Sequence, residues 1–226
     1  MPGPLALLHR LCYTKEKSLE ERMLYMNPEQ LLAILSTAER LKCTPRHSWT
    51  SSGRRESVAE HSWRLSLLAL LVTDEFPDLD MDRVIRMCLI HDLGEAFTGD
   101  IPSFQKTKAD SATEDQKLDQ WIATFPMPLR EELQALLQEM GEMKTKESRL
   151  YKALDNLEAV IQHNEADIST WLPLEYELQY TYGSDKVGFS PWLQQLKSAI
   201  DRRTTEKIAG ASASAAVNNH MKTDIT

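Results

Sequence analysis

Two histidines and two aspartates in this chain have the types and spacing that could bind a metal ion. His91 and Asp92 stand side by side at the end of the apolar run CLI. His61 precedes them in the segment ESVAEHSWR, and Asp155 follows in the segment KALDNLEA. A set of imidazole nitrogens and carboxylate oxygens suits Mn²⁺, Co²⁺, Fe²⁺, Ni²⁺ or Zn²⁺, whereas Mg²⁺ usually takes fewer nitrogens. The residues therefore predict a site for a divalent cation.

Two further acids follow the His-Asp pair in the stretch LGEAFTGDIP. Glu95 and Asp100 lie in a segment that we expect to be a long polar loop, residues 95–110. Burying an unpaired charge is costly, so these acids either face solvent or are compensated by a nearby cation. If burial or neighbouring carboxylates raise its pKa, either acid could transfer a proton in catalysis. Lys106, on the same loop, is either a second cation of this site or simply solvated.

The composition favours one helical domain of the globular kind. Hydrophobic residues make up 42% of the 226 residues, and there are only eight glycines. The net charge of −8 argues against non-specific binding to nucleic acid, which needs a basic surface. Three scattered cysteines argue against a disulfide framework, and no apolar run is long enough to cross a bilayer. We therefore expect a cytoplasmic protein whose partners include neither nucleic acid nor a membrane.

Helical periodicity and capping residues predict an all-α fold that positions these residues. We expect helices over the ranges 27–41, 57–76, 80–94, 113–125, 128–140, 146–164 and 190–208. Asn27 and Asp80 are expected N-caps, and Ser57 with Glu60 has the spacing of a capping box. No strand pattern is evident. His61 therefore falls in the first turn of a helix.

The chain divides into a central domain and two flanking segments. Residues 1–25 have no clear periodicity and form an N-terminal extension. Residues 26–208 contain all the expected helices. Residues 209–226 are of low complexity, and we expect them to be a disordered tail.

The words ESVAEHSWR, LIHDLGEAFTGDIP and KALDNLEA resemble the motifs of the HD-domain metal-dependent phosphohydrolases, in particular their 5′-deoxynucleotidase branch. The resemblance covers about residues 30–200. It implies a single HD-domain helical bundle. It also implies a divalent-metal-dependent phosphomonoesterase that hydrolyses (deoxy)ribonucleoside 5′-monophosphates to nucleoside and phosphate. Because members of this family are often dimers, we expect a homodimer.

The resemblance also implies a role for the chemically capable residues. The four metal ligands are matched by His61, His91, Asp92 and Asp155. Glu95 and Asp100 match the two acids near the attacking water and the leaving group, and which acid has which role stays open. No histidine lies between the HD pair and the last aspartate, so we expect one metal ion. His163 lies two helical turns past the last ligand, and we expect it on the surface.

The segment PRHSW holds the expected contacts to substrate. Arg46 resembles an arginine near the phosphate, and its planar fork suits phosphate oxygens. Trp49 resembles a tryptophan near the sugar, although His47 and Ser48 separate it from the arginine, whereas some relatives have the two adjacent. The alternative for Trp49 is plain core packing. Lys106 is the third expected substrate contact.

Two other functions are compatible with these residues. The chain could be an HD phosphohydrolase that acts on another small phosphorylated metabolite or nucleotide, because pocket shape is not readable from sequence. It could instead be a non-catalytic metal-binding HD scaffold. A scaffold would be expected to have lost at least one ligand or acid, and this chain keeps all of them.

Overall fold

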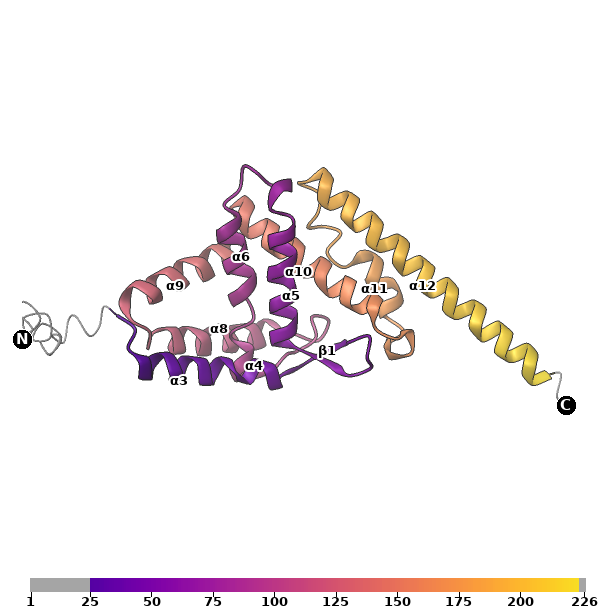
Figure 1. The fold of residues 1–226 in the computed structure, drawn as a ribbon, viewed down its shortest axis with the longest axis horizontal. Coiled ribbons are helices and arrows are strands. Elements are labelled where there is room, and N and C mark those ends of the chain that lie inside the picture. The colour runs from indigo at the N-terminus through magenta and orange to yellow at the C-terminus, as the bar shows by residue number, and fades with distance from the viewer. Residues whose placement is uncertain (1–24, 224–226) are drawn as a thin grey trace, which may run out of the picture.

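The computed structural model describes residues 25–223 and confirms an all-helical architecture (Figure 1). Its α-helices are α3 (Pro28–Ala38), α4 (Arg40–Cys43), α5 (Val58–Leu71), α6 (Met81–Ile90), α7 (Glu95–Thr98), α8 (Lys108–Ile122), α9 (Met127–Glu142), α10 (Lys146–Glu165), α11 (Glu175–Thr181) and α12 (Pro191–Thr223). Two short 3-10 helices span Thr73–Glu75 and Ile168–Thr170. Except for Tyr25, the expected N-terminal extension lies outside the described residues. Among the helices of the described region, none is both long and apolar enough to cross a membrane.

The helix starts follow the capping signals of the sequence. The side chain of Ser57 accepts a hydrogen bond from the Glu60 backbone N–H (3.3 Å), and the Glu60 side chain accepts one from the Ser57 backbone N–H (2.8 Å). Asn27 makes the equivalent box with Gln30 at the start of α3. Asp80 caps α6 through the backbone N–H of Arg83. These caps fix where α5 and α6 begin, and hence where their polar residues lie.

Helix α10 is the centre of the fold. It packs against α5, α6, α9 and α12, and Figure 1 shows it behind α5 in the middle of the molecule. Its stripe of Leu150, Leu154 and Leu157 is fully buried, together with Leu65 of α5 and Met87 of α6. The apolar periodicity of the sequence therefore identified the core correctly.

A small β-hairpin corrects the expectation that the chain has no strands. Strand β1 (Pro45–Trp49) pairs antiparallel with β2 (Arg55–Ser57), and Pro45 lies opposite Ser57. The turn between them is closed by a hydrogen bond from the Thr50 backbone N–H to the Arg54 carbonyl (2.8 Å). Such short strands offer too few positions for an alternating pattern to emerge, and the Ser- and Gly-rich turn between them is typical of a loop. For this reason the sequence did not predict the strands.

Three further segments differ from the expected helix pattern. The expected loop over 95–110 contains the single-turn helix α7. Helix α8 also starts within it, because the Thr107 side chain caps α8 by accepting a hydrogen bond from the Asp110 backbone N–H. Helix α11 was not predicted, because the residues it buries are polar rather than apolar, namely Glu175 and Gln179. Helix α12 continues through Thr223, into the segment expected to be a disordered tail. Its alanine-rich composition there favours helix.

We predict that two glycine substitutions have opposite effects on stability. Gly183 has a φ of +73°, and an added Cβ would lie 2.8 Å from the Cβ of Asn156. Gly183→Ala is therefore expected to lower the free energy of unfolding by about 2 kcal/mol. Gly141 lies in α9 with nothing within 4 Å of an added Cβ, so Gly141→Ala should raise it by up to about 1 kcal/mol. Urea unfolding curves of both variants check this, and equal midpoints would contradict it.

Candidate metal and substrate site

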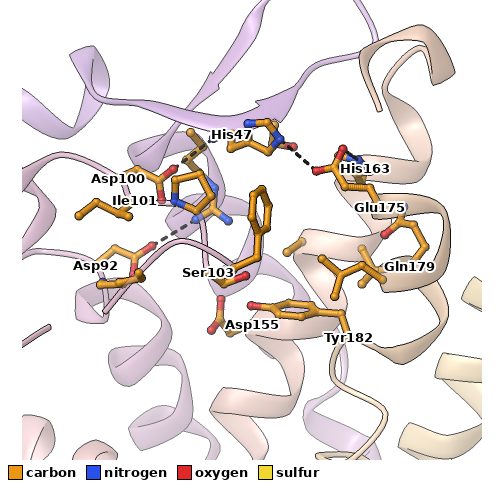
Figure 2. A pocket seen from close by; sticks show the side chains of 18 of the residues that line it. His47, Asp92, Asp100, Ile101, Ser103, Asp155, His163, Glu175, Gln179 and Tyr182 are labelled. Atoms are coloured by element: carbon orange, nitrogen blue, oxygen red, sulfur yellow. Dashed lines mark hydrogen bonds and ion pairs between the residues drawn. The ribbon is translucent and has the colours of Figure 1, made fainter. Parts of the chain in front are cut away.

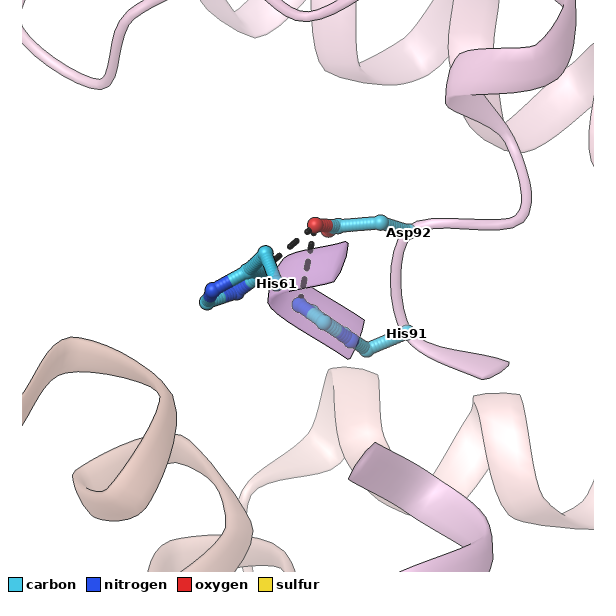
Figure 3. A group of neighbouring side chains, drawn as sticks. All are labelled: His61, His91 and Asp92. Carbon is cyan, nitrogen blue, oxygen red and sulfur yellow. Dashed lines mark ion pairs between the residues drawn. The ribbon is translucent and has the colours of Figure 1, made fainter. Parts of the chain in front are cut away.

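The four expected metal ligands converge at one point inside the fold. His61 comes from the first turn of α5, His91 ends α6, Asp92 follows it, and Asp155 lies in the middle of α10. His91 Nε2 lies 2.9 Å from Asp92 Oδ2 and 3.6 Å from Asp155 Oδ1. His61 Nε2 lies 3.1 Å from the same Asp155 oxygen and 4.0 Å from Asp92 Oδ2. Figure 3 shows His61, His91 and Asp92 pointing toward one another.

The state of His91 tests whether this cluster fits a cation. Its Nδ1 lies 2.9 Å from the Cys88 carbonyl oxygen, so Nδ1 carries the proton and donates to that oxygen. Its Nε2 is buried and, within residues 25–223, has no hydrogen-bond partner of acceptable geometry, although it lies 2.9 Å from Asp92. Burial alone would lower the pKa of His91, but Asp92 and Asp155 raise it to about 10. The site therefore favours positive charge at this nitrogen, and a divalent metal ion fits the donor set.

A second layer of charge holds the ligands in place. Glu158 contacts Nδ1 of His61 and lies one helical turn beyond Asp155 on the same face of α10. Arg64 Nε lies 3.6 Å from Glu158, which compensates its buried charge. Sequence analysis did not name Glu158, although its spacing from Asp155 is a detectable signal. Contacts of this kind fix the orientation of a ligating imidazole.

A second trio, Glu56, His61 and Glu158, also has its ligand atoms close together. Burial, then the charge of Glu158, raises the pKa of Glu56 to about 7. Arg46 Nε lies 3.3 Å from Glu56 and already neutralises this acid. The trio shares His61 with the four expected ligands, so we interpret it as the support of that site rather than as another one.

Glu95 is placed as a buried acid beside the ligands. It is the first residue of α7 and is only 4% exposed, and its Oε2 has no hydrogen-bond partner among the described residues. Burial, reinforced by the charges of Asp92 and Asp100, raises the pKa of Glu95 to about 9. The side chain therefore keeps a proton at neutral pH, unlike an ordinary surface carboxylate.

Asp100 reaches the same place through a sharp turn. Gly99 has a φ of +77°, a conformation that side chains rarely adopt, and it redirects the chain after α7. Asp100 Oδ2 then accepts a hydrogen bond from the backbone N–H of His47 in β1 (3.1 Å). The loop is thus tied to the hairpin at the residue that follows Arg46.

Two of the expected ligands, Asp92 and Asp155, line one cavity of about 210 Å³ together with Glu95 and Asp100. His61 and His91 are not among its lining residues. Figure 2 shows Asp92, Asp100 and Asp155 on one side of it, and His163, Glu175 and Gln179 on the other. Three cations line it as well. Arg46 Nη1 lies 3.3 Å from Asp92, and Lys106 Nζ lies 2.7 Å from Glu114 Oε2. Sequence analysis missed the third, Lys152, whose Nζ lies 2.7 Å from Asp155 Oδ2.

The structure places two residues differently from the sequence expectation. Trp49 is not among the residues that line the cavity, and the guanidinium of Arg55 lies 4.6 Å from its ring centroid. The carbonyl oxygen of Trp49 accepts a hydrogen bond from Gln162 Nε2 (2.7 Å). The expectation that His163 is a surface residue is wrong, because this side chain is buried and lines the cavity. The spacing along the helix argued against His163 as a metal ligand, but it gave no information about the cavity next to the ligands.

The helical fold and a buried centre of two histidines and two aspartates define a metal-binding domain of the HD type. The HD domain family matches residues 38–197, and the chain belongs to this family. It is 31% identical over 188 residues to the 5′-deoxynucleotidase HDDC2 of Bos taurus, covering 81% of this chain and 90% of the relative. It is 29% identical over 167 residues to the 5′-deoxynucleotidase hdd1 of Schizosaccharomyces pombe, covering 65% and 83% of the two chains.

Among solved structures, the fold is similar to a predicted metal-dependent phosphohydrolase from Magnetospirillum magnetotacticum. The TM-score is 0.63 at 25% identity, and the match covers 79% of this chain and 94% of the other. A conserved hypothetical protein from Pyrococcus furiosus gives a TM-score of 0.59 at 27% identity, with 76% and 99% covered. The similarity thus extends over nearly the whole length of both solved chains.

We predict that the four-residue cluster binds one divalent ion per chain. In protein stripped with a chelator, Asp92→Ala is expected to weaken Mn²⁺ binding by more than about 100-fold, because it removes a ligand oxygen. Glu95→Gln should bind Mn²⁺ nearly as the wild type does, since Glu95 lies beside the ligands but is not one of them. Isothermal titration calorimetry measures both affinities and the stoichiometry. Unchanged binding in Asp92→Ala would contradict this assignment.

Proposed function

We propose that this chain is a divalent-metal-dependent phosphomonoesterase that hydrolyses deoxyribonucleoside 5′-monophosphates to nucleoside and phosphate. The observation that carries the proposal is that the cluster of four expected ligands opens, through Asp92 and Asp155, onto a cavity that the buried acid Glu95 and Arg46 also line. The names of the relatives, 5′-deoxynucleotidases from vertebrates and yeast, support the same substrate class.

Arg46 is the residue that would bind the phosphate. Its Nε and Nη1 are engaged by Glu56 and Asp92, both at 3.3 Å, which holds the guanidinium rigidly at the edge of the ligand cluster. This arrangement leaves Nη2 to donate to a phosphate oxygen. A divalent ion bound by the four ligands would supply Lewis acidity towards water and the phosphoryl group.

Glu95 and Asp100 would carry the proton transfers. Glu95 holds a proton in a buried position next to the ligands, so it can donate that proton to the leaving 5′ oxygen. Asp100 has one oxygen fixed by the His47 N–H, which leaves Oδ1 to accept a proton from the attacking water. The roles of the two acids, which the sequence leaves open, are assigned here from the raised pKa of Glu95.

The test of the function is phosphate release from chelator-stripped protein with single metals restored. We expect release from deoxyribonucleoside 5′-monophosphates to return with Mn²⁺, Co²⁺, Fe²⁺, Ni²⁺ or Zn²⁺ and less well with Mg²⁺. Glu95→Gln, loaded with Mn²⁺, should lose about 10²- to 10⁴-fold in kcat, because it cannot transfer a proton. The same assay is run with nucleoside triphosphates and with ribonucleoside 5′-monophosphates as comparison substrates.

Two outcomes would contradict the proposal. Release from triphosphates or another phosphorylated metabolite, but not from nucleoside monophosphates, would keep the hydrolase and change its substrate. No release with any restored metal, from protein that still binds Mn²⁺, would indicate the non-catalytic scaffold.

We also propose that the chain forms a homodimer through the exposed face of α5. Trp63, Leu67, Leu70 and Leu71 recur at helical spacing on this helix, and Leu71 is 73% exposed. An apolar stripe of this kind on a helix surface is typical of a protein interface. Light scattering should therefore give twice the chain mass for the wild type. Leu71→Glu should give one chain mass, whereas Leu174→Glu, at an exposed leucine before α11, should leave the dimer intact. A monomeric wild type would contradict the dimer.

A further inference from the structure

The cavity has a second polar wall, away from the metal ligands, formed by His47, His163, Glu175 and Gln179 (Figure 2). Glu175 and Gln179 lie one turn apart on α11 and are 4% and 5% exposed. Glu175 Oε1 lies 3.0 Å from His47 Nε2, and its Oε2 accepts a hydrogen bond from the Leu172 backbone N–H (2.5 Å). The same oxygen lies 3.3 Å from His163 Nε2. Strand β1, the end of α10 and the start of α11 therefore meet at one carboxylate.

His47 lies between two charged residues. Arg55 Nη1, which can only donate, lies 3.5 Å from His47 Nδ1. His47 Nε2 lies 3.0 Å from Glu175 Oε1. Both ring nitrogens of His47 are used, and this imidazole serves to hold Glu175 rather than to bind a ligand.

His163 is in the opposite situation. Its ring lies against Trp171, with centroids 5.0 Å apart, and burial lowers its pKa although Glu175 opposes the shift. The shift favours the neutral imidazole. Its Nε2 is buried, and among the described residues its contact with Glu175 at 3.3 Å does not have the geometry of a hydrogen bond. A poorly satisfied buried nitrogen is unfavourable, so this atom has the capacity to bind a polar atom of a ligand.

Gln179 is a second polar residue of the wall that can make a further hydrogen bond. Its Nε2 makes a long hydrogen bond of 3.4 Å to Asn164 Oδ1, which leaves the amide oxygen available. Apolar side chains border this polar wall within the cavity, namely Ile101, Phe104, Val160 and Leu178. The ring of Phe104 meets that of His47 edge-on, with centroids 5.5 Å apart. Apolar sides around a polar wall match a flat heterocycle, which has apolar faces and a rim of donors and acceptors.

We propose that this polar wall binds the edge of the substrate's nucleobase, with His163 and Gln179 as specificity-determining residues and Glu175 as a positioning residue. The inference rests on the proposed function, because a phosphate held at Arg46 and the ligand cluster directs the nucleoside into the remaining part of the cavity. Neither the HD motifs nor the expected contacts of the sequence include this wall.

The experiment compares deoxyribonucleoside 5′-monophosphates with 2-deoxyribose 5-phosphate, which has the same phosphate ester and no base. For Mn²⁺-loaded wild type, we expect kcat/KM to be about 10- to 100-fold higher for at least one of the nucleotides. His163→Phe, which keeps an aromatic ring against Trp171, and Gln179→Leu should each raise KM for that nucleotide about tenfold. Neither variant should change kcat/KM for the base-free substrate. Glu177→Gln, at an exposed position of α11, is the matched control and should change neither substrate.

The base-free substrate also separates the possible failures. Loss of activity on both substrates in equal proportion, in both variants, would overturn the base site and indicate a structural role for the wall. Equal use of both substrates by the wild type would overturn the base site while leaving a metal-dependent phosphomonoesterase. If the wild type hydrolyses neither substrate, the proposed function fails, and this inference fails with it.

Discussion

The structure depends on one electrostatic constraint, the burial of two carboxylates and two imidazoles around a common point. Asp92 and Asp155 are brought within 4.0 Å of the Nε2 atoms of His61 and His91 at the junction of α5, α6 and α10. Carboxylates are stable in such a place only with compensating positive charge. Arg46 and Lys152 provide part of it, and the donor set leaves room for a cation to provide the rest.

That constraint explains the arrangement of the surrounding polar residues. Glu158 contacts His61, and Arg64 compensates the negative charge of Glu158. Negative and positive side chains therefore follow one another outward from the cluster. Glu95 lies in the same field but makes no ion pair with the residues that the structure describes, and its pKa rises. One local field therefore lowers the pKa of Asp92 and Asp155 and raises that of Glu95 beside them.

Local rules explain why the four expected metal ligands lie close together. Capping at Ser57 sets the register of α5 and thus of His61, and the leucine stripe of α10 sets the face that carries Asp155. The hairpin and α11 were not predictable in this way. Their positions depend on contacts between distant residues, such as His47 with Glu175, which leave no periodic pattern in the chain. Trp49 shows the same limit, because a motif resemblance does not determine which side of a short strand faces the cavity.

Strand β1 connects both ends of the cavity through consecutive residues. Arg46 reaches Asp92 at one end, and His47 reaches Glu175 at the other, while its backbone N–H holds Asp100 between them. The pairing of β1 with β2 is irregular between Pro45 and Trp49, and both neighbouring side chains line one cavity, whereas a regular strand would point them to opposite faces. The backbone of the hairpin therefore couples the cationic end of the cavity to the polar wall. A displacement of β1 would move the contacts at Asp92 and at Glu175 together.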